Sequence, residues 1–200
     1  RALEYMQTKE DLEIIVEDIF NQFRDDNVVY AEVRFAPLLH LNKGLLPMEV
    51  VEIISKKTKE KSNATGIEVN LILCTLRHYS EKQSLEIINL IKDFKGENVV
   101  GFDIAADEAG FPLDNHTKAF ELANESNIFC TAHAGEALGA HSVSETLEKL
   151  KPSRIGHGVR SIEDKSLLKK LKANNIHLEL CLTSNIVTKV YKSFKDHPVD

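Results

Sequence analysis

The chain has 200 residues and a net charge of −6, with 25 Lys and Arg residues against 31 Asp and Glu residues. This length is enough for one domain with a sizeable core. Both signs of charge are spread along the sequence, which excludes the clustered basic face typical of nucleic-acid or membrane-surface binding. No apolar run approaches the roughly 20 residues that span a bilayer. We therefore expect a single domain over residues 1–200 with no nucleic-acid or membrane partner, while these totals leave the oligomeric state undetermined.

The three cysteines, Cys74, Cys130 and Cys181, are odd in number, far apart and set in apolar segments. This pattern favours buried thiols over disulfides, and it is typical of a reducing compartment. We therefore expect a cytoplasmic protein.

Apolar patterns of strand and helix type alternate along the chain. Helices are predicted over about 9–24, from Pro47, from Ser80 to about Gly96, over 114–127, over 142–150 and around 167–171. Strands are predicted over 28–37, 69–75, 99–105, from Phe129, over 154–160 and over 177–185. Ser80 with Gln83, and Ser142 with Glu145, have the spacing of capping boxes. Six repeats of strand then helix predict an α/β protein with a parallel sheet.

Polar residues gather where the predicted strands end. They are Arg34, His78, Asp107, Glu108, His133, Glu136, His157, Ser184 and Asn185. The carboxyl ends of the strands carry the active site in a (β/α)8 barrel, whereas a doubly wound sheet binds ligands only at its switch point. Polar ends on nearly every strand favour the barrel, and the isolated glycines show no dinucleotide-binding turn.

His133 and Glu136 are the first pair of candidate functional residues, separated only by Ala134 and Gly135. A neutral imidazole can bind zinc, and a carboxylate beside such a metal can carry a proton. The alternatives are a core histidine with its hydrogen bonds satisfied and a solvated acid at a helix start. His157, between Gly156 and Gly158, is either close to a ligand or a plain turn histidine.

Other polar residues have structural interpretations. Asp107 and Glu108 form either an acidic pair at a helix start or a pair that orients a substrate or a histidine. Glu32 and Arg34 are expected to form an ion pair at the barrel rim. The remaining histidines are expected at the surface or behind the site, with His197 in a turn before Pro198; these are His40, His78, His116, His141, His177 and His197.

The ligands for a metal are incomplete. A catalytic zinc needs about three protein ligands and a water. The sequence contains neither His-x-His nor His-x-x-x-His, and His133 is the one obvious ligand. The residues alone therefore predict part of a metal site.

Five ordered motifs resemble those of the adenosine deaminases, particularly the bacterial type. They cover nearly the whole chain and are EVRFAP at 32–37, GFDIAADE at 101–108, TAHAGE at 131–136, RIGHGVR at 154–160 and CLTSN at 181–185. The resemblance implies a zinc-dependent (β/α)8 barrel that converts adenosine and deoxyadenosine to inosine forms and ammonia. By motif, it implies that His133 is a zinc ligand, that Glu136 donates a proton to the purine ring, and that His157 is the base acting on the zinc-bound water.

The same resemblance places substrate contacts at Glu136, Ala106 and Asp107. The family has Gly where Ala106 stands, and the backbone N–H there contacts the purine, so the added methyl bears on the choice of substrate. Asp107 and Glu108 after Ala106 fit the nucleoside branch better than adenine or AMP deaminases. Deamination of adenine, AMP or a modified nucleoside, and a non-catalytic barrel relative, stay as alternatives.

Two family motifs are absent from the chain, the His-x-His pair of the first strand and the Asp-Asp pair of the last. We therefore expect strands two to seven of the eight, a barrel truncated at both ends, and most zinc ligands outside this chain. By itself the 200-residue chain is expected to have little or no activity.

Overall fold

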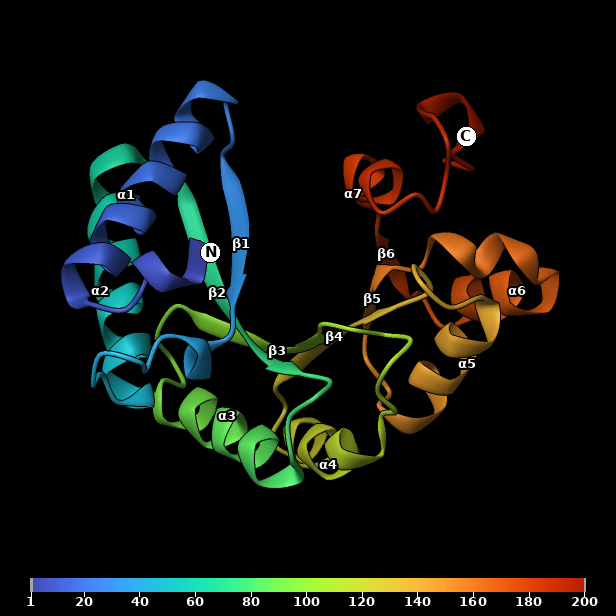
Figure 1. Ribbon diagram of the computed structural model, residues 1–200, viewed down its shortest axis with the longest axis horizontal. Helices are drawn as coiled ribbons and strands as arrows, with labels where there is room; N and C mark the ends of the chain where they lie inside the picture. Colours follow the sequence, from blue (N-terminus) through green and yellow to red (C-terminus); the bar gives the residue numbers. More distant parts are fainter. Residues whose placement is uncertain (1, 200) are drawn as a thin grey trace. The chain divides into compact units, whose positions relative to one another are not determined.

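The computed structural model describes residues 2–199, and its six strands form one sheet whose order follows the sequence (Figure 1). The strands are β1 (Tyr30–Phe35), β2 (Glu68–Leu76), β3 (Val99–Ala105), β4 (Phe129–Ala134), β5 (Arg154–His157) and β6 (His177–Glu179). β1 pairs in parallel with β2, β4 with β5, and β5 with β6.

Helices alternate with these strands. They are α1 (Lys9–Asp25), α2 (Pro47–Thr65), α3 (Glu81–Asp93), α4 (Thr117–Glu125), α5 (Ala140–Lys149), α6 (Lys165–Ala173) and α7 (Leu182–Val187). A doubly wound sheet reverses its strand order at a switch point, and the observed order has no reversal. Sequential parallel strands joined by helices are the arrangement expected of a (β/α) barrel.

The chain divides into two compact units. Among the described residues, one unit holds 2–74 and 85–102, and the other holds 75–84 and 103–199. The single domain expected over residues 1–200 stays a prediction.

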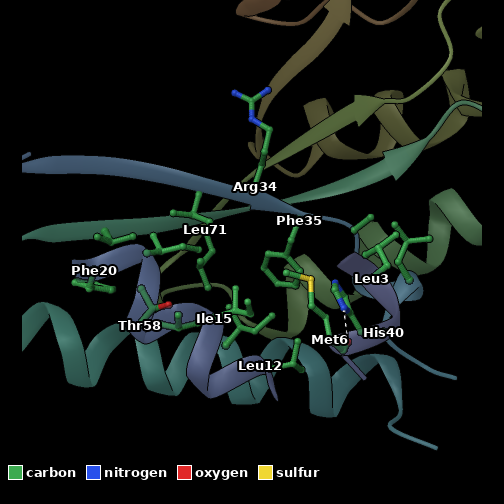
Figure 2. Close-up of a pocket in the computed structure, with 17 residues that line it drawn as sticks. Leu3, Met6, Leu12, Ile15, Phe20, Arg34, Phe35, His40, Thr58 and Leu71 are labelled. Carbon is green, nitrogen blue, oxygen red and sulfur yellow. Dashed lines mark hydrogen bonds between the residues drawn. The ribbon is translucent and has the colours of Figure 1, made fainter. Parts of the chain in front are cut away.

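In the first unit, α1 and α2 pack together over the same face of β1 and β2 (Figures 1 and 2). Thr8 caps α1 by accepting from the backbone N–H of Asp11, whose carboxylate accepts from the N–H of Thr8. α2 begins with Pro47 at its first turn and ends at Gly66, whose φ of 76° suits a residue without a side chain. The buried core residues of the two helices are Leu12, Val16, Phe20, Val50, Val51 and Ile54.

A cavity of about 310 Å³ lies between these helices and strands (Figure 2). Its walls are mostly aliphatic and aromatic, and none of the described residues that line it is acidic. Phe35 extends toward α1 and α2, whereas Arg34 extends from the opposite side of β1. His40 lies at the cavity edge, where its Nδ1 donates to the carbonyl of Met6 at 2.8 Å. The cavity is therefore a mostly apolar space, and the polar residues among its described lining are Arg34, His40 and Thr58.

In the second unit, a separate apolar cluster joins β4 and β5 to the helices that follow them. Its buried members are Ala134, Ala140, Val143, Ile155, Leu167 and Leu171, and Leu147, Leu168, Ile176 and Leu178 pack against it. This core anchors β4 and β5 next to His133 and His157, the two histidines that the sequence singles out.

Three expected elements are corrected. The last predicted strand, over 177–185, ends at Glu179, and its second half is the helix Leu182–Val187. The helix predicted over 114–127 begins with a 3-10 turn, Asp114–His116. The capping box at Ser142 is wrong, because α5 begins two residues earlier and the Ser142 hydroxyl donates to Glu108. An apolar sequence followed by short polar residues does not distinguish a strand end from a helix start.

Burial is also corrected at several residues. Cys74 and Cys130 are buried as predicted, but Cys181 is exposed because it stands between β6 and α7.

The predicted cap of α3 is confirmed, since the backbone N–H of Ser80 donates to the Gln83 side chain at 3.0 Å.

The histidines without an expected function fall into two groups. His78, His141 and His177 are exposed, as predicted. His40 and His116 are buried, which rules out the surface for them and leaves the expected place behind the site, and His197, expected in a turn, is buried as well. Each buried imidazole is hydrogen-bonded to a carbonyl or side chain that a linear sequence does not place beside it.

Candidate active site

His133 lies at the carboxyl end of β4, where its ring is held from one side by Asp103. Its Nδ1 is 3.1 Å from one oxygen of Asp103 and 3.2 Å from the other. Asp103 is fully buried in β3. Because Nδ1 contacts a carboxylate, Nε2 is the ring nitrogen that would bind a metal, and this arrangement recurs among metal-bound histidines. Gly156 faces His133 in the strand register, and a Cβ there would lie 3.0 Å from the ring.

The backbone of His133 is fixed by a buried arginine. Arg77 donates from Nη2 to the His133 carbonyl at 2.9 Å and from Nη1 to the Phe111 carbonyl at 3.2 Å. The Arg77 carbonyl accepts from Nε2 of His116 at 3.0 Å, which makes Nδ1 of His116 the acceptor for the Ser84 hydroxyl at 2.7 Å. Burial holds the pKa of His116 below its ordinary value. This neutral histidine supports the loop that carries Arg77.

Glu136 and His157 come together beside His133. Nδ1 of His157 is 3.3 Å from Oε1 of Glu136. The rings of His133 and His157 are nearly perpendicular, with centroids 5.3 Å apart. His157 is buried and has a φ of 62°, a left-handed conformation that costs a residue with a side chain about 1 kcal/mol or more. Strained backbone of this kind is typical of functional sites, and here it directs the imidazole toward the other two groups.

The loop that presents Glu136 is held by Glu108. One oxygen of Glu108 accepts from the backbone N–H of Gly135 and the hydroxyl of Ser142, both at 2.6 Å. The other accepts from the N–H groups of Glu136, Ala137 and Leu138 at 2.7 to 3.1 Å. Burial would raise the pKa of Glu108, but these hydrogen bonds outweigh it and hold the pKa below its ordinary value. Glu108 is therefore an ionised anchor for the loop, an option that the sequence left open.

Ala106 and Asp107 lie in the exposed loop after β3. Ala106 has a φ of 79°, a conformation that glycine adopts without strain. One oxygen of Asp107 accepts from the backbone N–H groups of Ala109 and Gly110 at 3.1 and 3.0 Å. The structure thus gives Asp107 a role in its own turn, and any contact with a substrate stays a prediction.

The donors for a metal are few in this chain. Across residues 2–199, no group of three or more His, Cys, Asp and Glu side chains could hold a metal ion. The imidazole of His133, oriented by Asp103, nevertheless fits the requirements of one metal ligand.

The adenosine deaminase family profile matches residues 2–200. The chain belongs to the adenosine deaminase family. Adenosine deaminase of Clostridium acetobutylicum is 35% identical over 193 residues, which are 96% of this chain and 58% of that protein. Adenosine deaminase 1 of Streptomyces coelicolor is 38% identical over 210 residues, 97% of this chain and 52% of that protein. The chain thus spans somewhat more than half of the curated relatives that it matches.

Solved structures of this family have the same fold. An adenine deaminase from Arthrobacter aurescens superposes with a TM-score of 0.88 at 26% identity, over 96% of this chain and 59% of that one. The N6-methyl-AMP deaminase of Arabidopsis thaliana gives a TM-score of 0.86 at 27% identity, over 96% and 58% of the two chains. The predicted fold class, an incomplete (β/α)8 barrel, is confirmed.

Several residues of the site were missed or undervalued in the sequence. One feature of the sequence could have pointed to Asp103, which is its position inside an apolar strand. A carboxylate buried there needs a partner. No feature of the sequence pointed to Arg77, Thr188 or His197, because their hydrogen-bond partners are not their neighbours along the chain.

Proposed function

We propose that the protein containing this chain is a zinc-dependent hydrolase that deaminates adenosine and deoxyadenosine to inosine, deoxyinosine and ammonia. The arrangement that supports this proposal is the close approach of His133, Glu136 and His157 at the ends of β4 and β5. The curated relatives at 35% and 38% identity are named adenosine deaminases, which favours the nucleoside as substrate.

In this mechanism, Zn²⁺ would be held partly by Nε2 of His133, and when bound it supplies a water that is acidic near neutral pH. Glu136 protonates the purine ring nitrogen, which makes C6 electrophilic. His157 orients the attacking water toward C6 and accepts a proton from that water. The C6–O bond forms and C6 becomes tetrahedral, His157 passes its proton to the amino group, and the C6–N bond breaks to release ammonia. The remaining hydroxyl proton is lost as the 6-oxo group forms, which restores the proton of Glu136. Ala106 and Asp107 would contact the purine from the loop after β3.

The alternative substrates are adenine, AMP or a modified adenosine nucleotide. The solved structures named adenine deaminase and N6-methyl-AMP deaminase, both above 25% identity, keep these substrates in consideration. A panel of adenosine, deoxyadenosine, adenine, AMP and N6-methyl-AMP, followed by ultraviolet absorbance, separates them. The highest kcat/KM is expected for adenosine or deoxyadenosine.

The test requires the protein at its full encoded length, reconstituted with zinc. Wild-type protein should convert adenosine, and Glu136→Gln should lose at least about 100-fold in kcat, because the amide cannot donate the same proton. Thr183→Val, an exposed substitution on α7 outside the site, is the matched control and should keep its activity. Zinc-loaded wild-type protein that leaves every compound of the panel unchanged would refute the proposal.

We propose a cytoplasmic location on the basis of the cysteines. Cys74 and Cys130 are buried in strands, as is usual for thiols of a reducing compartment. This pattern supports the proposal of a cytoplasmic enzyme. No helix within residues 2–199 is long and apolar enough to cross a membrane.

A further inference from the structure

Glu136 receives hydrogen bonds from a helix that has no role in the proposed chemistry. Three side chains of α7 and its C-cap donate to Oε1: Asn185 Nδ2 at 2.8 Å, Ser184 Oγ at 3.2 Å and Thr188 Oγ1 at 3.2 Å. Nδ1 of His157 is also 3.3 Å from this oxygen. Within the described part of the chain, every hydrogen bond to the Glu136 carboxylate ends on Oε1.

This one-sided arrangement distinguishes the two oxygens of Glu136. Donors that point at Oε1 occupy its lone pairs, and a proton placed there would face other protons. A proton carried by the carboxyl group therefore sits on Oε2, which accepts none of the hydrogen bonds from α7 and its C-cap. A proton donor acts efficiently only when its proton is held in one direction toward the acceptor.

The amide of Asn185 is itself held in one orientation. Because the carboxylate of Glu136 can only accept, the NH₂ group of Asn185 must face it, which leaves Oδ1 on the other side. There, Oδ1 is 3.0 Å from Nε2 of His197, so that nitrogen carries the hydrogen. Asn185 is fully buried and His197 is buried, so water cannot readily replace either partner. The hydrogen bonds run from His197 through Asn185 to Glu136, and the same NH₂ group of Asn185 also lies 3.3 Å from Nδ1 of His157.

We propose that Asn185, supported by His197 and assisted by Ser184 and Thr188, is a positioning residue that keeps the transferable proton of Glu136 on Oε2. This inference rests on the proposed function, since it assigns the direction of a proton donor. It extends that function to a helix and a C-terminal segment to which the mechanism proposed above assigns no part.

Steady-state kinetics of full-length, zinc-loaded protein test the proposal. Asn185→Ala is expected to lower kcat by about 10- to 100-fold, with KM for adenosine changed by less than about threefold. Asn185→Asp should be worse than Asn185→Ala, since it places a carboxylate against Oε1 in nearly the same volume. His197→Gln, which can still donate to Oδ1, should keep more activity than His197→Phe.

Two matched controls separate positioning from general destabilisation. Thr188→Val removes a hydroxyl that contacts Glu136, whereas Thr183→Val makes the same change at an exposed position of α7 and should leave kcat unchanged. Ser193→Ala removes a hydrogen bond to Asp196 in the same C-terminal segment without touching Glu136. A normal kcat in both Asn185 variants, or equal losses in Thr183→Val and Thr188→Val, would overturn the proposal.

A crystal structure of Asn185→Asp protein decides the question independently of activity. The carboxylate of Glu136 is expected to turn away from residue 185, and an unmoved carboxylate contradicts the proposed positioning. If wild-type protein deaminates no purine, the proposed function fails, and the crystal structure still decides whether α7 orients Glu136. If wild-type protein is active and the Asn185 variants match it, only the positioning role fails.

Discussion

Replacing Glu108 by Gln tests whether the loop that carries Glu136 is held by a charged anchor. The amide has the same shape as the carboxylate, but one of its two ends donates instead of accepting. An NH₂ group in place of the oxygen that serves Glu136, Ala137 and Leu138 would face three backbone N–H groups. An NH₂ group in place of the other oxygen would face only Gly135, because the hydroxyl of Ser142 can rotate and accept. The second orientation is therefore expected.

The magnitude follows from these contacts. One buried backbone N–H, that of Gly135, loses its acceptor, which costs about 1–3 kcal/mol. The three remaining backbone bonds change from charged to neutral acceptors, which removes about another 1–2 kcal/mol in total. We expect Glu108→Gln to lower the free energy of unfolding by about 3 kcal/mol.

Urea unfolding of full-length protein, followed by circular dichroism at pH 7, measures this loss. Glu121→Gln, an exposed substitution on α4, is the matched control and should change the free energy by less than about 0.5 kcal/mol. The wild-type pKa of Glu108 lies below its ordinary 4.5. Its stabilising contribution is therefore complete above that pH and is lost as the pH falls through the folded-state pKa, a dependence that the Gln variant lacks. A loss in Glu108→Gln no larger than in the control would refute the anchoring role.

Three further predictions concern the second unit. Burial lowers the pKa of His116 below its ordinary 6.5. As the pH falls, the unfolded chain therefore protonates this histidine at a higher pH than the folded chain does, and the free energy of unfolding should decrease below about pH 6.5. His116→Gln should remove part of this decrease, as measured by urea unfolding at several pH values. Asp103→Asn should weaken zinc binding through His133 by about 10- to 100-fold, as measured by competition with a chelator, and equal affinities would contradict the orienting role of Asp103. Cys181 is exposed, whereas burial raises the pKa of the Cys130 thiol to about 12; a thiol reagent should label Cys181 first in mass spectrometry, and earlier labelling of Cys130 would contradict the burial.

The regular elements were largely predictable because local patterns determine them. The apolar spacing of α1 and the extended run of β3 appear in the structure close to their predicted bounds. The failures occurred where two structures fit the same residues. Residues 177–185 read as one strand, but only the first part has a neighbouring strand, β5, with which to pair. After Glu179 the chain begins a helix, and its polar side chains reach Glu136.

By itself, the sequence determined the alternation of strands and helices, the family, and the residue types at 133, 136 and 157. Those features depend on hydrophobic periodicity and on short motifs, which are local properties. Only the tertiary structure decided that Asp103 orients His133, that Glu108 anchors the loop, and that Asn185 reaches Glu136. Each of these contacts joins residues about 30 to 50 positions apart. Hydrogen bonds over such separations depend on how the strands pair and the loops close, and a linear pattern contains neither.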